Sequence, residues 1–197
     1  MTGDMRDRNQ IVPNELLPSP AIHRFALPFG KQRTKCHAPS TSRFKYCGKQ
    51  RDRTDDMAAV GRATGFVCAN LAPAQPVSEQ LLKRCDLIVV NEVEAAFYGD
   101  LLHRGGGRVV ITQGARGAEM YHRGVKMAWA TPPSVVAIDA TGAGDAFVGA
   151  IVVALLDGME PRDALDFACA AGALAATRAG AQPSLPTRDE VEGLLAG

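Results

Sequence analysis

Hydrophobic and polar positions divide the chain into two parts with different patterns. Before about residue 60, apolar residues follow neither a helical nor a strand period. Prolines interrupt this part at Pro13, Pro18, Pro20, Pro28 and Pro39. We therefore expect an atypical, basic, proline-rich and disordered segment over residues 1–60, and a folded part over residues 61–197.

The second part predicts strands that alternate with helices. Short apolar runs, typical of strands buried on both faces, are Phe66–Ala69, Leu87–Val90 and Arg108–Thr112. Two further strands, Ala118–Tyr121 and Lys126–Ala130, are expected to form a hairpin. Stretches of helical length are Glu79–Arg84, Ala95–Leu102, Ala146–Leu156, Arg162–Arg178 and a last helix from Thr187 to near Leu195. Such alternation predicts a mostly parallel sheet with helices on both faces.

A further apolar run, Val135–Ile138, is expected to be the end of a buried strand. Small residues follow it, and then a helix begins. The turn between them therefore lies at a helix N-terminus, where unpaired amides and the helix dipole favour anions. Gly142, Ala143 and Gly144 allow a phosphate to approach these amides closely.

Asp145 follows this turn, in the first turn of the expected helix. A carboxylate beside an anion is repelled by it. The arrangement makes sense if Asp145 removes a proton from an attacking hydroxyl while the amides hold the developing charge. The alternative is that Asp145 only complements the helix dipole, which is worth roughly 0.3–1 kcal/mol.

Two other loops, at the ends of expected strands, contain residues that could bind a ligand. Asn91 and Glu94 are three residues apart at a strand-to-helix junction, where they could also form an ordinary helix cap. Thr112 begins a turn with two glycines that ends at Gly117, and an ordinary hairpin turn has the same appearance. Asn91, Thr112 and Thr141 each follow an apolar run, so we expect them at one edge of the sheet, where ligands of α/β proteins bind.

Composition restricts the classes of function. The chain has 197 residues, 46% of them hydrophobic and 22% charged, with a net charge of +1. This is a globular composition that favours neither nucleic acid nor membrane as a partner. No apolar run approaches the ~20 residues of a membrane span. The five scattered cysteines do not indicate a disulfide framework, so we expect a cytoplasmic protein with Cys68, Cys85 and Cys169 buried.

One basic stretch is an exception to this balance. Residues 31–53 contain eight Lys or Arg and a single acid, Asp52. With Phe44 and Tyr46 it could be a nucleic-acid-binding arm, although the scarcity of apolar residues favours a tail. Cys36, His37 and Cys47 are too irregularly spaced for a zinc site.

Taken together, these loops resemble the C-terminal signature of the ribokinase-like (phosphofructokinase-B type) carbohydrate kinases. Asp139–Asp145 is similar to the family's Asp-x-Thr-Gly-Ala-Gly-Asp signature, Asn91–Glu94 to its Asn-x-x-Glu motif, and Thr112–Gly117 to its Thr-x-Gly-x-x-Gly turn. Thr177–Pro186 is similar to the ribokinase branch. The resemblance covers roughly residues 60–197. It implies an α/β fold, the ribokinase-like three-layer α/β/α sandwich, truncated at the N-terminus because residues 1–60 show no sugar motif or lid.

The resemblance also implies an activity, namely transfer of the γ-phosphate of ATP to a sugar hydroxyl, with D-ribose as the expected sugar. Asp145 would be the general base beside the sugar, and the amides of Gly142, Ala143 and Gly144 would form the anion hole. ATP binding would fall to residues of the three loops and one helix: Asn91, Thr112, Gln113, Gly114, Ala115, Arg116, Gly117, Gly144 and Cys169.

Two cations are implied as well. Glu94 would organise Mg²⁺ through water, which suits an ion that keeps several waters. A monovalent cation, K⁺, would bind side-chain oxygens of Asp139 and Ser184 and backbone carbonyls of further residues. These residues are Thr141, Ala175, Arg178 and Gly180. The alternative for this last segment is a helix C-cap followed by a proline-rich connection.

Other functions stay open at this point. Members of the family are homodimers through a lid that this sequence does not show. The chain could therefore be a non-catalytic nucleotide-binding remnant or an interaction fragment. Fructokinases and adenosine kinases share the turn at Asp145, so the sugar is inherited from the resemblance.

Overall fold

A six-stranded sheet organises the domain. The computed structural model describes residues 44–47 and 64–197, with side chains for the second range. The strands are β1 (Phe44–Cys47), β2 (Phe66–Asn70), β3 (Leu87–Asn91), β4 (Arg108–Thr112), β5 (Ala118–His122) and β6 (Val125–Ala130). They lie side by side in chain order. β1 to β4 are parallel, and β5 and β6 are antiparallel to their neighbours. Apart from β1, the expected disordered segment and its basic arm lie outside the described residues.

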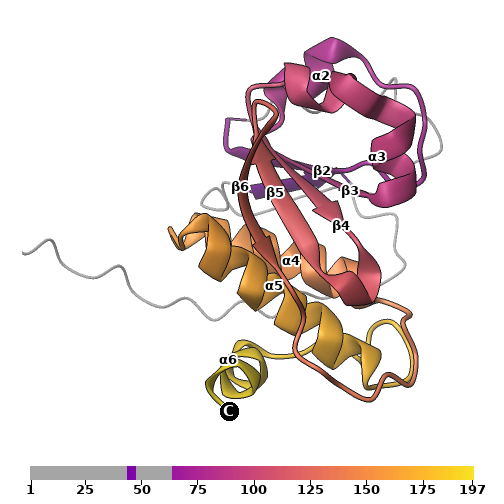
Figure 1. Ribbon diagram of the computed structural model, residues 1–197, viewed down its shortest axis with the longest axis vertical. Coiled ribbons are helices and arrows are strands. Elements are labelled where there is room, and N and C mark those ends of the chain that lie inside the picture. Colours follow the sequence, from indigo (N-terminus) through magenta and orange to yellow (C-terminus); the bar gives the residue numbers. More distant parts are fainter. Residues whose placement is uncertain (1–43, 48–63) are drawn as a thin grey trace, which may run out of the picture. The chain divides into compact units, whose positions relative to one another are not determined.

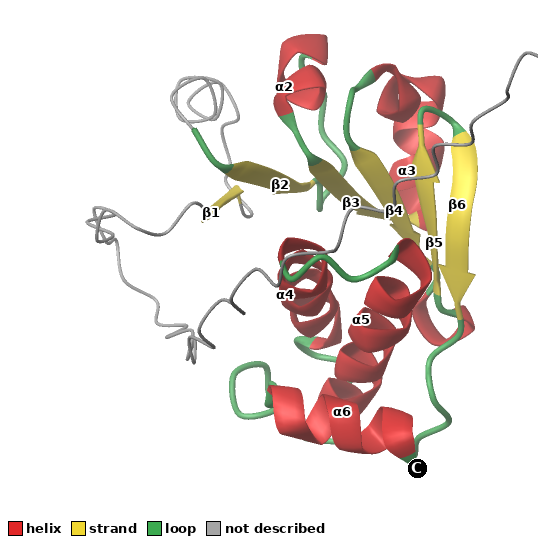
Figure 2. Ribbon diagram, turned by 90° about the vertical axis from the view of Figure 1, so that its left-hand side faces the viewer, coloured by secondary structure: helices red, strands yellow, loops and turns green. Residues whose placement is uncertain are grey.

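Helices cover both faces of this sheet (Figures 1 and 2). On one face are α2 (Glu79–Arg84), α3 (Glu92–Tyr98) and the 3₁₀ helix η1 (Gly99–Arg104). On the other face are α4 (Ala143–Leu156), α5 (Pro161–Ala176) and α6 (Arg188–Ala196). A second 3₁₀ turn, η2 (Gly114–Arg116), joins β4 to β5. The expected three-layer α/β/α architecture with a mostly parallel sheet is confirmed.

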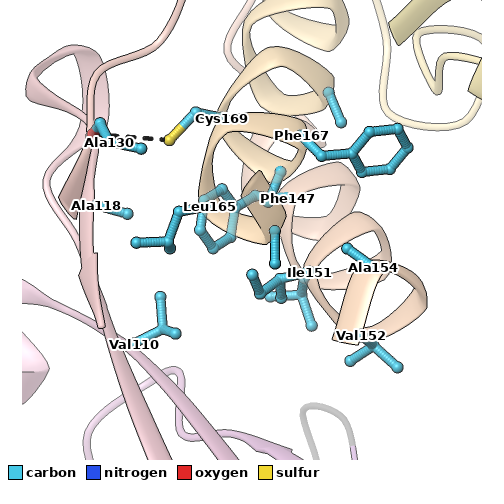
Figure 3. Packing of buried hydrophobic residues seen from close by; sticks show 14 of the residues in the cluster. Val110, Ala118, Ala130, Phe147, Ile151, Val152, Ala154, Leu165, Phe167 and Cys169 are labelled. Carbon is cyan, nitrogen blue, oxygen red and sulfur yellow. Dashed lines mark hydrogen bonds between the residues drawn. The ribbon is translucent and has the colours of Figure 1, made fainter. Parts of the chain in front are cut away.

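Alternate residues of the strands supply two separate cores. Val89, Val110 and Met120 point to the layer of α4, α5 and α6, where they meet Ile151 and Leu165. Part of this cluster is drawn in Figure 3. Their strand neighbours face α2, α3 and η1 instead: Val67, Ala69, Ile88, Val90 and Val109. This strict alternation is the strand period of two, with both faces buried.

Most expected elements are confirmed to within a residue or two at their ends. Ser78 caps α2, since its side chain accepts a hydrogen bond from the amide of Leu81. Thr187 and Glu190 form a reciprocal capping box at the start of α6. The helix expected to end at Leu102 instead stops at Tyr98, because Gly99 has a φ of 53° and the chain continues as η1. Cys68, Cys85 and Cys169 are buried.

The expectation of a buried strand end at Val135–Ile138 is wrong. These residues belong to the connection between β6 and α4, and Val136 and Ile138 are 86% and 71% exposed. The amide of Ile138 donates to the carbonyl oxygen of Ala176, at the end of α5, at 2.7 Å. An apolar run of strand length therefore pairs with a helix terminus rather than with another strand.

Within the described residues, no helix combines the length and the apolar character that crossing a membrane requires.

Candidate functional site

The N-terminus of α4 presents open amide groups. Gly142 caps the helix in the left-handed conformation, with φ 86°, and no side chain of the described residues caps the helix there. The amide of Ala143 donates to the carbonyl of Ala140 at 3.2 Å, so it is used within the turn. Within the part of the chain that the structure describes, the amides of Gly142, Gly144 and Asp145 have no acceptor. A Cβ at Gly144 would meet nothing within 4 Å. This end of the helix therefore suits an anion.

Asp145 lies in the first turn of α4 and is half-buried. Among the described residues, its carboxylate has no hydrogen-bond or ion-pair partner. It is therefore available to accept a proton close to the open amides. A carboxylate and an anion-binding helix end in one turn are the two groups that proton removal from an attacking hydroxyl requires.

Asp139 fixes the turn that precedes α4. One carboxylate oxygen, Oδ1, accepts from the amide of Thr141 at 2.9 Å, and Oδ2 accepts from the amide of Gly180 at 2.9 Å. Hydrogen bonds from Thr141 and Gly180 lower the pKa of Asp139 to about 2. The side chain is therefore a carboxylate at neutral pH. It joins the α4 turn to the segment that follows α5.

The segment after α5 packs directly against the α4 turn. A Cβ at Gly142 would lie 2.8 Å from the carbonyl oxygen of Ala181, so glycine is required there by space as well as by φ. Ser184 is fully buried and donates its hydroxyl to the same carbonyl of Ala181 at 3.0 Å. No pattern in the sequence indicates Ala181, whose backbone joins the two segments.

Four of the predicted K⁺ ligands, Asp139, Thr141, Gly180 and Ser184, lie in this neighbourhood. Asp139 contacts Thr141 and Gly180 directly, and Ser184 reaches the same turn through Ala181. The carbonyl of Ala175 accepts from the amide of Arg178 at 3.3 Å. The donor set contains oxygens only, including one carboxylate held in its charged form, and this chemistry fits a hard cation. Coordination by these residues stays a prediction.

The second part of the site lies at the ends of β3 and β4. Asn91 and Thr112, the last residues of these strands, are register partners. Asn91 Oδ1 accepts from the amide of Glu94 at 2.9 Å, and Glu94 Oε2 accepts from the amide of Asn91 at 2.8 Å. The motif thus forms a reciprocal capping box, as the alternative of an ordinary helix cap predicts. Glu94 is 6% exposed and one of its oxygens is engaged, so a role toward Mg²⁺ would use the other oxygen and stays a prediction.

The turn from Gln113 to Gly117 is closed by backbone hydrogen bonds. The amide of Gln113 donates to the carbonyl of Gly117 at 2.8 Å, and the amide of Gly117 donates to that of Gly114 at 3.0 Å. A Cβ at Gly117 would lie 1.9 Å from the carbonyl oxygen of Ala130, which only glycine avoids. Ala115 is exposed, and Arg116 forms an ion pair with Glu92, the first residue of α3. The turn is therefore joined to the Asn91 motif.

One face of α5 brings these two parts together. Cys169 donates its thiol to the carbonyl oxygen of Ala130 at 3.9 Å, beside Gly117 (Figure 3). One turn further along α5, a Cβ at Gly172 would lie 3.3 Å from the carbonyl oxygen of Ala143. The Gly117 turn and the α4 N-terminus therefore lie at neighbouring positions along one helix.

Cys169 itself is 4% exposed, and burial raises the pKa of its thiol to about 12. It is a neutral core thiol at physiological pH. Its predicted position at an adenine edge stays a prediction.

The sequence did not indicate a positioning role for several residues near the site. Gly172 allows α5 to approach α4, and Glu92 and Glu190 anchor loop arginines. Glu190 had a partial signal, because its capping box with Thr187 is readable from the sequence. Its second partner, Arg178, is twelve residues away and outside any local pattern.

Comparison with known proteins gives a consistent result. Residues 51–188 match the pfkB family of carbohydrate kinases. Ribokinase of Haemophilus influenzae is 38% identical over 139 residues, which cover 63% of this chain and 45% of that protein. A crystal structure of ribokinase from Thermotoga maritima is similar with a TM-score of 0.65 and 33% identity, over 72% of this chain and 52% of that one.

A second structure, Arabidopsis thaliana ribokinase complexed with ribose and ATP, has a TM-score of 0.62 at 28% identity. The likeness covers 70% of this chain and 50% of that one. The chain thus spans about half the length of the relatives that it matches.

Proposed function

Because this chain belongs to the pfkB family of carbohydrate kinases, we propose that it carries out the ATP-dependent phosphorylation of a sugar hydroxyl, with D-ribose as acceptor and D-ribose 5-phosphate as product. The observation that carries the proposal is the α4 N-terminus, where open amides and the carboxylate of Asp145, which has no partner among the described residues, share one helical turn. Ribose as the sugar is supported by the likeness to ribokinases.

In the proposed reaction, Asp145 accepts the proton of the sugar hydroxyl as its oxygen attacks the γ-phosphorus of ATP. A new P–O bond forms to the sugar, the bond to the β-phosphate oxygen breaks, and ADP leaves. The amides of Gly144 and Asp145, together with that of Gly142, hold the negative charge on the transferring group. They are fixed in place before the reaction, so little reorganisation is needed. The amide of Asp145 takes the place expected for that of Ala143, which donates to the carbonyl of Ala140.

The two loops at the β3 and β4 ends would bind the nucleotide. This nucleotide-binding part consists of Asn91, Thr112 and the turn from Gln113 to Gly117. The ion pair of Arg116 with Glu92 connects its two loops. Glu94 would hold the water shell of Mg²⁺, which neutralises phosphate charge when bound. The carboxylate of Asp139 and the nearby backbone oxygens would hold K⁺, whose charge stiffens the turn before α4.

The test is phosphoryl transfer by the purified full chain with ATP, Mg²⁺, K⁺ and ribose, using fructose as a second acceptor. Asp145→Asn should lower kcat by about 10²–10⁴-fold, the range of general base catalysis. Asp163→Asn is the matched control, because Asp163 holds the same position in the first turn of α5. Its activity should equal that of the native chain.

The outcomes separate the alternatives. Turnover with fructose and not with ribose would show that the acceptor is fructose instead of ribose. ATP binding without turnover on either sugar would indicate a non-catalytic nucleotide-binding protein. Equal activity of both variants would remove Asp145 from the reaction.

A further inference from the structure

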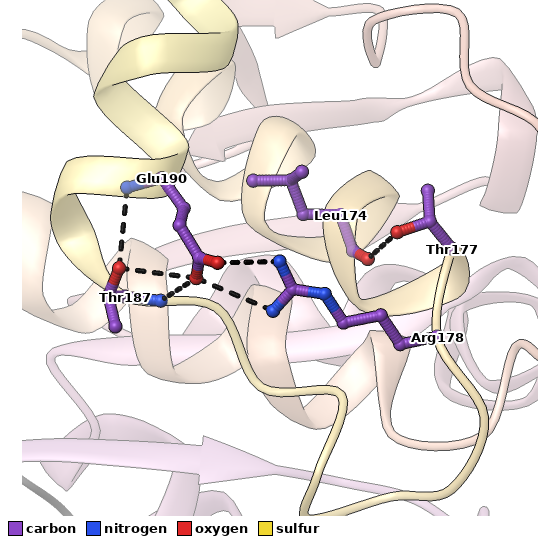
Figure 4. Close-up of polar contacts among 5 residues, drawn as sticks. All are labelled: Leu174, Thr177, Arg178, Thr187 and Glu190. Atoms are coloured by element: carbon purple, nitrogen blue, oxygen red, sulfur yellow. Dashed lines mark hydrogen bonds and ion pairs between the residues drawn. The ribbon is translucent and has the colours of Figure 1, made fainter.

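The loop that follows α5 is closed by a single carboxylate on α6. Glu190 Oε1 accepts from Arg178 Nη2 at 2.6 Å, and Oε2 accepts from Arg178 Nη1 at 3.4 Å. The same Oε2 accepts from the amide of Thr187 at 2.7 Å and from its hydroxyl at 3.2 Å. Figure 4 shows these contacts. Arg178 and Thr187 are the two ends of the loop, so Glu190 holds both ends.

The enclosed loop carries groups assigned above to the cation site. Gly180 donates its amide to Asp139, and Ser184 lies buried against Ala181, whose backbone packs on Gly142. The position of residues 178–187 therefore determines where the oxygens of this segment lie relative to the turn before α4.

The helix that bears Glu190 is itself anchored to the rest of the layer. Val191 is 2% exposed and belongs to the core of α4 and α5. Arg188 forms an ion pair with Asp157 at the end of α4 and lies over the ring of Phe167 at 5.4 Å. Glu190 therefore projects from a helix that is anchored to the core, so its carboxylate can hold the loop in one position.

We propose that Glu190 is a positioning residue that clasps the loop 178–187 and thereby sets the affinity of the chain for K⁺. It touches neither substrate nor cation and acts through Arg178 and the loop backbone. The inference rests on the cation site of the proposed function. It assigns to Glu190 a role that differs from that of the predicted cation ligands.

Glu190→Gln tests the clasp with little damage to the helix. Glutamine keeps an oxygen for the amide of Thr187, so the capping box survives, whereas the charged fork to Arg178 is lost. Glu192→Gln is the matched control, because Glu192 lies on the same helix and, among the described residues, pairs with Arg188 alone, at 3.4 Å. Both variants remove one carboxylate from α6.

The first measurement is hydrogen exchange of the peptide that covers residues 178–187. Exchange should be faster in Glu190→Gln than in the native chain and unchanged in Glu192→Gln. The second measurement is the rise of Tm with KCl, relative to tetramethylammonium chloride at the same ionic strength. The K⁺ concentration needed for a given rise of Tm should increase at least about tenfold in Glu190→Gln, as for losses of residues behind metal ligands.

Each outcome decides the inference. Unchanged loop exchange in Glu190→Gln, or a rise of Tm at each K⁺ concentration equal to that of the native chain, would overturn it. A native chain whose Tm does not respond to K⁺ would overturn it too, together with the cation site. The kinase proposal would still stand or fall by ribose phosphorylation and Asp145→Asn, which this experiment does not use.

Discussion

At the scale of single residues, two glycines of the α4 turn have different tasks. Gly142 has φ 86°, and a Cβ there would meet the carbonyl oxygen of Ala181 at 2.8 Å. Gly144 has open space around the same position. The first glycine is needed for folding, whereas the second leaves room for a ligand.

Alanine substitution should separate these tasks. Gly142→Ala should lower the free energy of unfolding by about 1–3 kcal/mol, because it combines a left-handed φ with a steric clash. Gly144→Ala should leave stability equal or raise it by up to about 1 kcal/mol, since alanine favours helix. It should nevertheless weaken ATP binding, because the methyl group occupies the open space. Urea unfolding and ATP titration measure both effects, and similar stability losses in the two variants would contradict the distinction.

Asp139 makes the stability of the folded chain depend on pH in the acid range. Its pKa of about 2 lies below the ordinary value of 3.8, so the folded chain prefers the carboxylate. The stabilisation is fully present above about pH 4 and is lost as the pH falls toward 2.

Asp139→Asn should reveal this dependence. The variant should have a lower Tm than the native chain at pH 7, and the difference should shrink as the pH falls from about 4 toward 2. Thermal scans across this range measure it, and Glu190 titrates in both proteins, so its contribution cancels. A Tm difference that is constant with pH would show that the charge of Asp139 is not involved.

At the scale of elements, α6 is a short helix held by few core contacts. Val191 is its buried residue, whereas Leu195 is 44% exposed. Val191→Ala should cost about 1–3 kcal/mol of unfolding free energy through lost burial and a cavity. Leu195→Ala should change it by less than about 0.5 kcal/mol. Urea titrations measure both, and equal effects would mean that α6 does not dock through Val191.

The elements were largely predictable because both faces of the sheet are buried. The runs Leu87–Val90 and Val109–Ile111 are apolar throughout and are too short for amphipathic helices of ordinary length. The run Val135–Ile138 has the same composition, and the local pattern cannot say that Ala176, far along the chain, supplies its hydrogen-bond partner. Asn91 and Glu94 show the same limit, because a capping box and a magnesium motif share one spacing.

The site was predictable only in part. The small residues of the α4 turn predict it from the sequence alone. The role of the loops around it follows from the resemblance to the kinase family. The bond from Gly180 to Asp139 joins residues 41 positions apart, and no periodicity predicts it.

At the scale of the whole molecule, the buried thiols report on cooperativity. Cys169 lies in the core under α4 and α5, and Cys85 lies in the core on the opposite face of the sheet. If the sheet couples the two cores, both thiols should become reactive to iodoacetamide at the same urea concentration. Peptide mass spectrometry of alkylated samples measures this. Earlier labelling of Cys85 would mean that the layer of α2 and α3 opens independently.

The hydrogen bond between Asp139 and Gly180 has a consequence for the order of assembly. The β5–β6 hairpin and the α4–α5 pair join neighbouring stretches of chain, and such local structure forms early. The contact across 41 residues can form only once α5 has docked and the chain beyond it has returned to the α4 turn. The α4 turn is therefore expected to form last, and under mild stress it is expected to open first. Such a chain would cease to work before it ceases to be folded.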